Sequence, residues 1–176
     1  MRIKIDVESL VKNTKRFERI YNALSDFFDE APRNYFESTN GAEGRVQDTN
    51  TSKDFWCSDS DTKLEVSLST METHCAFWLK INGCRASAEY EERTRGLRIS
   101  GGLGNAEEIL TKIEEEIEEI NEFIRDNAPE GFPQINIEAP KGVVLNSLKD
   151  AQNNETTSKE AFDKFIDQKV QEILRK

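Results

Sequence analysis

Apolar residues recur at intervals of three and four over residues 7–30, a pattern that predicts an amphipathic helix. Its apolar side consists of Val7, Leu10, Val11, Phe17, Ile20, Tyr21, Leu24, Phe27 and Phe28. The other side carries the cations Lys12, Lys15, Arg16 and Arg19. Because the residue before a proline avoids the helical conformation, we expect Ala31-Pro32 to end this helix.

Between residues 63 and 100, apolar and polar positions alternate, which is typical of half-buried strands. We expect four strands there, over residues 64–69, 73–81, 84–91 and 97–100. Asn82-Gly83 favours a two-residue type I′ turn, since both central residues of that turn need a positive φ. This turn would pair Ile81 with Cys84 and place the apolar row of both strands on one face. Residues 37–54 are polar and rich in turn formers, and are predicted to form a long loop or a poorly ordered excursion.

A second amphipathic helix is predicted over residues 106–126. Asn105 is a good N-cap, and Glu108 follows three residues later, which resembles a capping box. The apolar stripe consists of Ala106, Leu110, Ile113, Ile117, Ile120 and Ile124, widened by Ile109 and Phe123. A stripe this broad favours packing on a sheet over a two-stranded coiled coil.

The C-terminal part of the chain is less regular. Residues 128–142 hold three prolines and an extended piece over residues 134–138. A short helix is predicted near residues 144–151, and Thr157 with Glu160 forms a capping box for a last helix. The apolar stripe of that last helix is Phe162, Phe165, Ile166, Val170, Ile173 and Leu174.

Together these elements predict an α+β fold with an N-terminal helix, a four-strand antiparallel meander, a long acidic helix packed on the sheet and a helical C-terminal tail. A chain of 176 residues fits one compact domain with an appendage. We expect a core domain over residues 1–127. Residues 128–176 are predicted to be a proline-containing linker and a helical extension that docks on the core.

Negative charge is concentrated in the second helix. The chain has a net charge of −10, and residues 105–126 hold nine carboxylates against two cations. Like charges four residues apart, such as Glu115 and Glu119, each cost about 0.2–0.5 kcal/mol of helix stability. A sequence that accepts these costs favours a use for the charge, although glutamate is also simply a good helix former on a solvated face. The predicted partner-binding residues are Glu107, Glu114, Glu115, Glu118, Glu119 and Glu122.

Trp78 is a further candidate for partner binding. Its neighbours on the same predicted strand, Phe77 and Leu79, belong to the apolar row, so Trp78 falls on the opposite face of the sheet. If helices cover only the face of that row, Trp78 is exposed and could anchor a partner. If the first helix covers the other face, Trp78 belongs to the core.

Several chemistries are disfavoured by the residues present. His74 is the only histidine, and the three cysteines, Cys57, Cys75 and Cys84, lack the spacing of a metal site. The glycine-rich segment 100–105 matches neither a P-loop nor a dinucleotide fingerprint. The sequence therefore predicts no metal and no cofactor, and it disfavours an enzyme.

The charge and the termini also bear on location. An acidic chain lacks the cations that bind nucleic acid or an anionic membrane directly. The first residues do not form the apolar region of a signal peptide, and the odd number of cysteines is typical of a reducing compartment. We therefore expect a cytoplasmic protein.

The favoured hypothesis is a non-enzymatic module that presents its acidic helix to a basic protein surface. One version is an inhibitor or regulator that mimics nucleic acid and occupies the groove of a nucleic-acid-binding protein, a role typical of small acidic proteins of viruses and mobile elements. An alternative is a structural or assembly protein that forms a homo-oligomer. A small enzyme that uses scattered carboxylates is a third.

Overall fold

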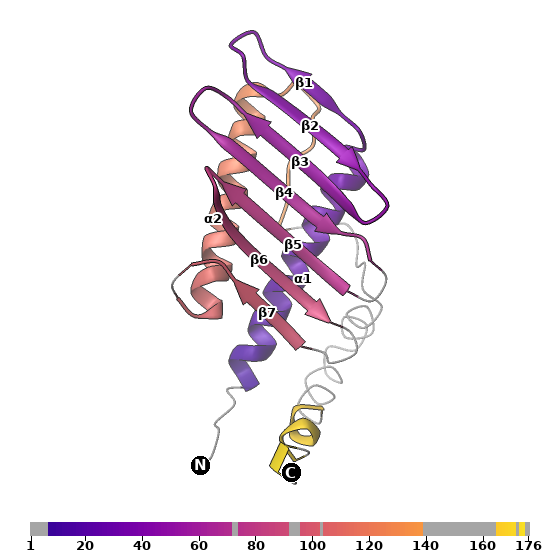
Figure 1. Cartoon of the computed structure of the whole chain (residues 1–176), viewed down its shortest axis with the longest axis vertical. Helices are drawn as coiled ribbons and strands as arrows, with labels where there is room; N and C mark the ends of the chain where they lie inside the picture. The colour runs from indigo at the N-terminus through magenta and orange to yellow at the C-terminus, as the bar shows by residue number, and fades with distance from the viewer. Residues whose placement is uncertain are drawn as a thin grey trace.

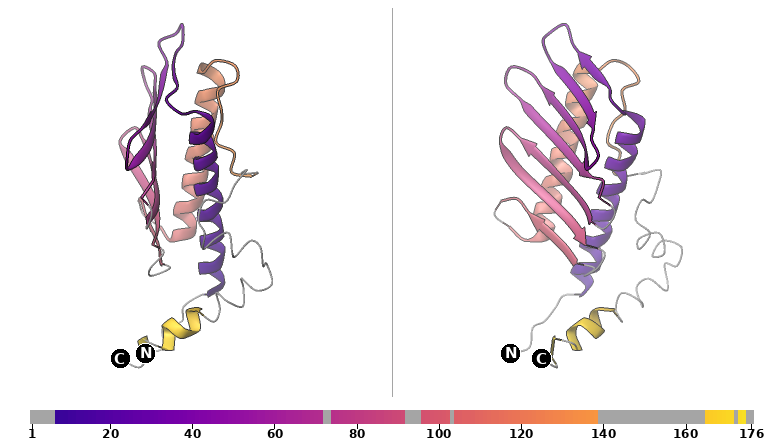
Figure 2. Two further views of the ribbon diagram at one scale, coloured as in Figure 1. Left: turned by 90° about the vertical axis from the view of Figure 1, so that its right-hand side faces the viewer. Right: turned by 45° about the vertical axis from the view of Figure 1, so that its right-hand side comes forward.

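The chain forms a two-layer structure in which one antiparallel sheet is covered on one face by two helices (Figures 1 and 2). The computed structural model describes residues 7–71, 74–91, 96–102, 104–138, 165–171 and 173–174. The two long helices are α1 (Val7–Glu30) and α2 (Ala106–Asn127). The strands are β1 (Tyr35–Glu37), β2 (Glu43–Asp48), β3 (Ser52–Ser58), β4 (Lys63–Ser69), β5 (His74–Ile81), β6 (Cys84–Glu91) and β7 (Gly96–Ser100).

Both long helices lie where their apolar periodicity predicts them. α1 begins at Val7 and ends at Glu30, so its predicted bounds are confirmed. α2 extends one residue beyond the predicted end, to Asn127. The backbone N–H of Glu108 donates to Oδ1 of Asn105 at 2.9 Å, which confirms Asn105 as the N-cap.

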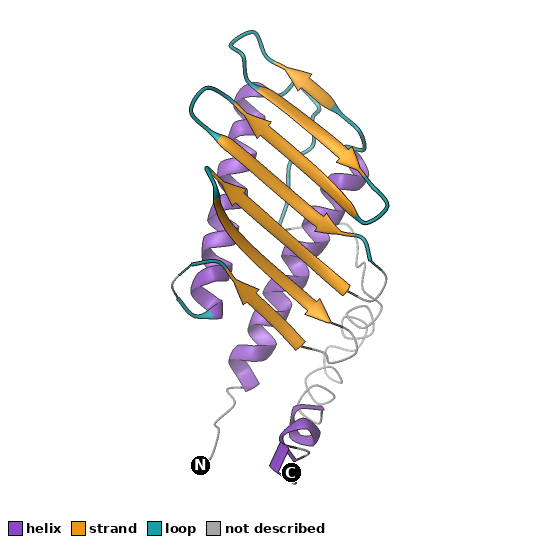
Figure 3. Cartoon of the chain, in the orientation of Figure 1, coloured by secondary structure: helices purple, strands orange, loops and turns teal. Residues whose placement is uncertain are grey.

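The predicted four-strand meander is wrong, because the described residues form one sheet of seven strands in the order β1 to β7. Figure 3 draws these strands in orange. The three additional strands, β1 to β3, fall over residues 35–58 and occupy most of the segment predicted as a loop. Their apolar signal is sparse. On β1 and β2, only Phe36 and Val46 are large, buried and apolar. Gly44 occupies the other inward position of β2, two residues before Val46.

Gly44 is needed where it lies. Phe36 is its direct cross-strand partner, and the Phe36 ring fills the space that a side chain at Gly44 would occupy. An aromatic ring thus covers a strand glycine, which supplies the missing packing but hides the alternating pattern from the sequence. This is the physical reason why the strand pattern could not be recognised here.

The predicted hairpin at Asn82-Gly83 is confirmed. Both turn residues have positive φ, 47° and 91° respectively. Ile81 pairs with Cys84, and the register continues to Cys75 opposite Tyr90, as the turn length requires. This register aligns Phe77 and Leu79 with small residues on β6, so the helices can approach that side of the sheet closely.

The core lies between the sheet and the two helices. Phe17 of α1 stacks on Phe77 of β5 with ring centroids 5.3 Å apart. At the other end of α1, Phe27 meets Phe55 of β3 edge to face, also at 5.3 Å. Phe132, beyond α2, contacts both Phe55 and Phe36 and so extends the core.

The segment after α2 is held by a buried amide. Asn121 donates its side-chain N–H to the carbonyl of Ile135 and accepts from the N–H of Ile135, both at 2.8 Å. The predicted extended piece over residues 134–138 is described and forms no strand. Residues 165–171 and 173–174 are helical, whereas the predicted start of that helix and the predicted helix at 144–151 lie outside the described residues.

Candidate functional site

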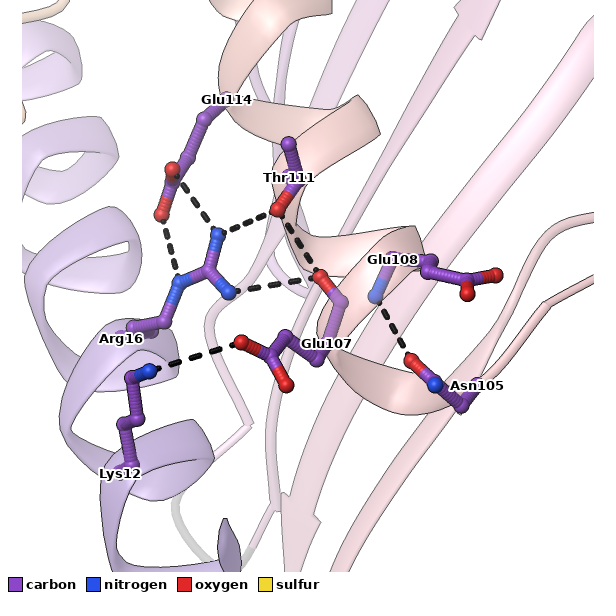
Figure 4. Close-up of polar contacts among 7 residues, drawn as sticks. All are labelled: Lys12, Arg16, Asn105, Glu107, Glu108, Thr111 and Glu114. Atoms are coloured by element: carbon purple, nitrogen blue, oxygen red, sulfur yellow. Dashed lines mark hydrogen bonds and ion pairs between the residues drawn. The ribbon is translucent and has the colours of Figure 1, made fainter.

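Arg16 joins the cationic side of α1 to the acidic helix α2 (Figure 4). Its Nε and Nη2 atoms donate to the two carboxylate oxygens of Glu114 at 3.1 and 3.0 Å. The same guanidinium donates to the hydroxyl of Thr111 at 2.9 Å and to the carbonyl of Glu107 at 3.3 Å. A two-pronged contact of this kind suits the planar guanidinium, so this group fixes α2 against α1.

Two further glutamates of the predicted set also pair within the chain. Lys12 lies 3.4 Å from Glu107, and Arg125 lies 2.8 Å from Glu118. The hydrogen bond from Arg125 lowers the pKa of the Glu118 carboxyl, so that carboxylate is ionised at neutral pH. Both pairs are exposed, so water and salt screen them and they contribute little to stability.

The remaining acidic side chains of α2 form what we call the acidic ridge. It consists of Glu108, Glu115, Glu119, Glu122 and Asp126, all exposed. They recur at intervals of seven, four, three and four, which places them on one side of the helix, away from the buried Ile113 and Ile117. Within the described part of the chain, none of these five carboxylates forms an ion pair.

A groove runs beside this helix, between α1, α2 and residues 134–138. Its volume is about 710 Å³. Carboxylates from all three segments line it, namely Asp26, Glu30, Glu114, Glu118 and Glu138, alongside the cations Arg19 and Arg125. The negative surface of the helical layer therefore extends from the groove to the acidic ridge.

Glu116 differs from its neighbours because it is buried. It is 6 % exposed, and its Oε2 atom has no hydrogen-bond partner. Burial raises the pKa of this carboxyl, whereas Lys112, 3.8 Å away, partly offsets the shift. Its position on the side of α2 away from α1 makes it a structural group and not part of the acidic ridge.

Trp78 lies on the sheet face opposite to the helices. The alternation along β5 buries Phe77 and Leu79 beneath the helices and leaves Trp78 half-buried on the other face. No described helix covers that face, as the edge-on view in Figure 2 shows. The described helices thus cover only one face, as the first alternative supposed, but Trp78 is half-buried on the other face and not fully exposed.

The potential metal ligands do not converge. Cys57 and Cys75 are buried and Cys84 is exposed, and all three are free thiols. His74 lies 3.5 Å from Glu89 on the sheet face away from the buried Cys75. Among the residues with described positions, no group of three or more His, Cys, Asp and Glu side chains is arranged to hold a metal ion.

The cross-helix pairs were missed by sequence reasoning, although the signal was present. Lys12 and Arg16 lie four residues apart on the polar side of α1, and Glu107 and Glu114 lie seven apart on α2. Each spacing places its two residues on one helix face. That the two faces meet depends on the helices packing side by side on the same side of the sheet, which the patterns of the separate helices do not determine.

Comparison with known proteins adds no constraint on this site. No protein-family model matches the chain, and neither the curated proteins nor the solved structures contain a match. None of the described helices combines the length and apolar character needed to cross a membrane.

Proposed function

We propose that this protein is a non-catalytic binding module that presents the acidic ridge of α2 to a basic protein surface. The observation that carries the proposal is the division among the carboxylates of α2. Glu107, Glu114 and Glu118 are paired with cations of the same chain, whereas Glu115 and Glu119 lie exposed on the ridge without such a pair in the described residues. The proposal therefore keeps Glu115, Glu119 and Glu122 of the predicted glutamates, leaves out the three paired ones, and adds Glu108 and Asp126, which were not predicted.

Rigidity supports this role. Most of the apolar side of α2 is buried, with Leu110, Ile113 and Ile120 at 0 % exposure. Arg16 and Asn121 fix the helix laterally, to α1 and to the segment that follows α2. A helix fixed in this way loses little backbone freedom on binding, which favours it as a recognition surface.

The charge density of the ridge can be compared with that of nucleic acid, which the narrower version of the hypothesis says that the protein mimics. Its five carboxylates span residues 108–126, about 27 Å of helix, with an average spacing of about 7 Å between charges. A single strand of DNA carries about one charge per 3.4 Å. The ridge alone thus carries fewer charges per unit length than a phosphate backbone. We therefore favour the more general proposal, in which the ridge binds a basic protein without mimicking nucleic acid.

A cytoplasmic location is part of the proposal. Cys84 is an exposed free thiol, which is typical of a protein kept in a reducing compartment. Burial raises the pKa of the Cys57 thiol to about 12, so this cysteine is unreactive and has a packing role.

The test is partner capture from a native host extract by the immobilised protein, followed by mass spectrometry. E115Q/E119Q removes two ridge charges, and E107Q/E118Q removes two paired charges as a matched control. The proposal expects the first variant to lose the captured basic protein and the second to keep it, with unchanged circular dichroism in both. Equal loss, or no loss in either, contradicts a role for the ridge.

A further inference from the structure

The face of the sheet opposite to the helices, which we call the open face, is turned toward the viewer in Figure 1. Its side chains come from alternate positions of every strand and are mostly polar or charged. Two tryptophans interrupt this polar surface, Trp56 on β3 and Trp78 on β5, and both are half-buried. Tryptophan on an otherwise polar surface is typical of a protein–protein contact.

Trp78 lies in a packed environment on this face. Its cross-strand neighbour on β4 is Ser67, which is 3 % exposed although no described helix covers it. The guanidinium of Arg85 lies over the Trp78 ring, 5.0 Å from its centroid. This cation–π contact holds Arg85 flat against the sheet, so Trp78 and Arg85 form one ordered surface.

A cationic pair lies beside this tryptophan. Lys80 and Arg85 are directly opposite each other on β5 and β6, and both are exposed. Like charges in such a position are destabilising, and neither cation forms an ion pair within the described residues. Glu65, the other cross-strand neighbour of Lys80, is the nearest carboxylate in the register. The open face therefore presents a basic and aromatic patch made of Trp78, Lys80 and Arg85.

The acidic ridge matches this patch in charge and spacing. Side chains directly opposite on neighbouring strands have Cβ atoms about 5 Å apart, as Lys80 and Arg85 do. Side chains four residues apart on a helix have Cβ atoms about 6 Å apart, as Glu115 and Glu119 do. Each surface contains a pair of like charges, and contact between the two surfaces would bring opposite charges together.

We infer that the patch of Trp78, Lys80 and Arg85 on the open face binds the acidic ridge of a second copy of this chain. The inference rests on the proposed function, because it assigns a partner to the same ridge. The ridge and the open face lie on opposite layers of the molecule, so the contact is head to tail. Such a heterologous contact builds a chain or ring of copies and not a closed two-fold dimer.

Net charge decides against single-stranded nucleic acid as the occupant. Bases stack on aromatic side chains of open sheets, and Lys and Arg bind the backbone. Such binding needs a surplus of cations, whereas this chain carries a net charge of −10. A second copy of this chain, in contrast, supplies exposed carboxylates that can pair with Lys80 and Arg85.

The test is sedimentation velocity of the full chain at several concentrations, with four variants. K80E/R85E reverses the patch, E115K/E119K reverses the ridge, and the fourfold variant reverses both and keeps the native net charge. The neutral variant K80Q/R85Q removes the two charges without adding carboxylates to the sheet, so it tests the patch even if K80E/R85E misfolds. We expect concentration-dependent association of the native chain, weakened at least about tenfold in each single-surface variant and restored in the fourfold variant.

The ridge reversal separates this inference from general repulsion between acidic molecules. E115K/E119K brings the net charge closer to zero, so general repulsion predicts stronger association, whereas the inference predicts weaker association. A native chain that stays monomeric, a fourfold variant that fails to reassociate, or binding of labelled oligouridylate that K80E/R85E abolishes would each overturn the inference. If the native chain is monomeric and E115Q/E119Q still loses a captured basic protein, the proposed function stands alone.

Discussion

The contact between Arg16 and Glu114 is expected to contribute more to stability than any other ion pair between α1 and α2. Replacing Arg16 by Met keeps most of the apolar stem but removes the guanidinium, and replacing Glu114 by Gln removes the charge at constant shape. A double-mutant cycle over R16M, E114Q and R16M/E114Q isolates the energy of this pair.

The magnitude follows from burial and geometry. The side chains of Arg16 and Glu114 are 17 % and 35 % exposed, and two hydrogen bonds join them. Hydrogen bonds to charged groups contribute about 1.5–3 kcal/mol when buried, and exposed ion pairs about 0.2–1 kcal/mol. A half-buried, two-pronged pair should lie between these ranges, so we expect a coupling energy of about 1–2 kcal/mol.

Lys12 and Glu107 provide the internal comparison. They join the same two helices, but their side chains are 65 % and 52 % exposed and a single contact of 3.4 Å links them. A second cycle over K12M and E107Q should give less than about 0.5 kcal/mol.

Urea unfolding followed by circular dichroism measures both cycles, provided the slope of the transition is the same in all variants. Equal coupling energies for the two pairs would refute the reasoning from burial. A coupling energy below about 0.5 kcal/mol for Arg16 and Glu114 would show that this contact does not fix α2.

Three further predictions concern stability. Burial raises the folded-state pKa of Glu116 above its value of 4.5 in an unfolded chain. As the pH rises from 4.5 through this higher folded-state pKa, ionisation of Glu116 lowers the free energy of unfolding. E116M should therefore stabilise the protein by about 1 kcal/mol at pH 7, and urea unfolding at pH 4 should show a smaller gain. Gly44→Ala places a methyl group in the space of the Phe36 ring, and a lowered melting temperature, partly restored by F36L in the double variant, is expected. Asn121→Ala leaves the N–H and C=O of Ile135 unpaired and should lower the free energy of unfolding by about 2–3 kcal/mol, whereas Q134A, at an exposed neighbouring position, should have little effect on urea unfolding.

The helices and the central hairpin were predictable because local patterns determine them. The stripe over residues 7–30 and the stripe on α2 each bury one continuous helix side, which leaves a strong period in the sequence. Asn82-Gly83 fixes the register of β5 and β6 through its backbone conformation alone. These features need no knowledge of the rest of the fold.

The first three strands were not predictable in the same way. Few large apolar side chains point inward from these strands, because Gly44 has no side chain and the ring of Phe36 fills its place. The outward positions carry charged or polar residues such as Arg45 and Asp54. Phe55 and Cys57 do alternate with Trp56 on β3, so this strand left a short signal. The sheet is stabilised there by neighbouring strands and by Phe132, which lies 77 residues beyond Phe55.

The candidate site was predictable only as a concentration of charge. Counting carboxylates identified α2 as the acidic element, but not which of its glutamates are paired. Arg16 and Glu114 are 98 residues apart in sequence, and their contact depends on how α1 and α2 pack on the sheet. The division between paired glutamates and the acidic ridge is therefore a property of the tertiary structure.

The most direct measurement of the central claim is an NMR titration of the isotope-labelled full chain with an oligolysine peptide. The peptide stands for a basic surface, and the backbone and carboxyl signals of each glutamate on α2 report where it binds. We expect the largest shifts at Glu115, Glu119 and Glu122, and small shifts at Glu107 and Glu114, whose carboxylates are already paired. Shifts of equal size along the whole helix, or the largest shifts at Glu107 and Glu114, would contradict the claim that the acidic ridge is the binding surface.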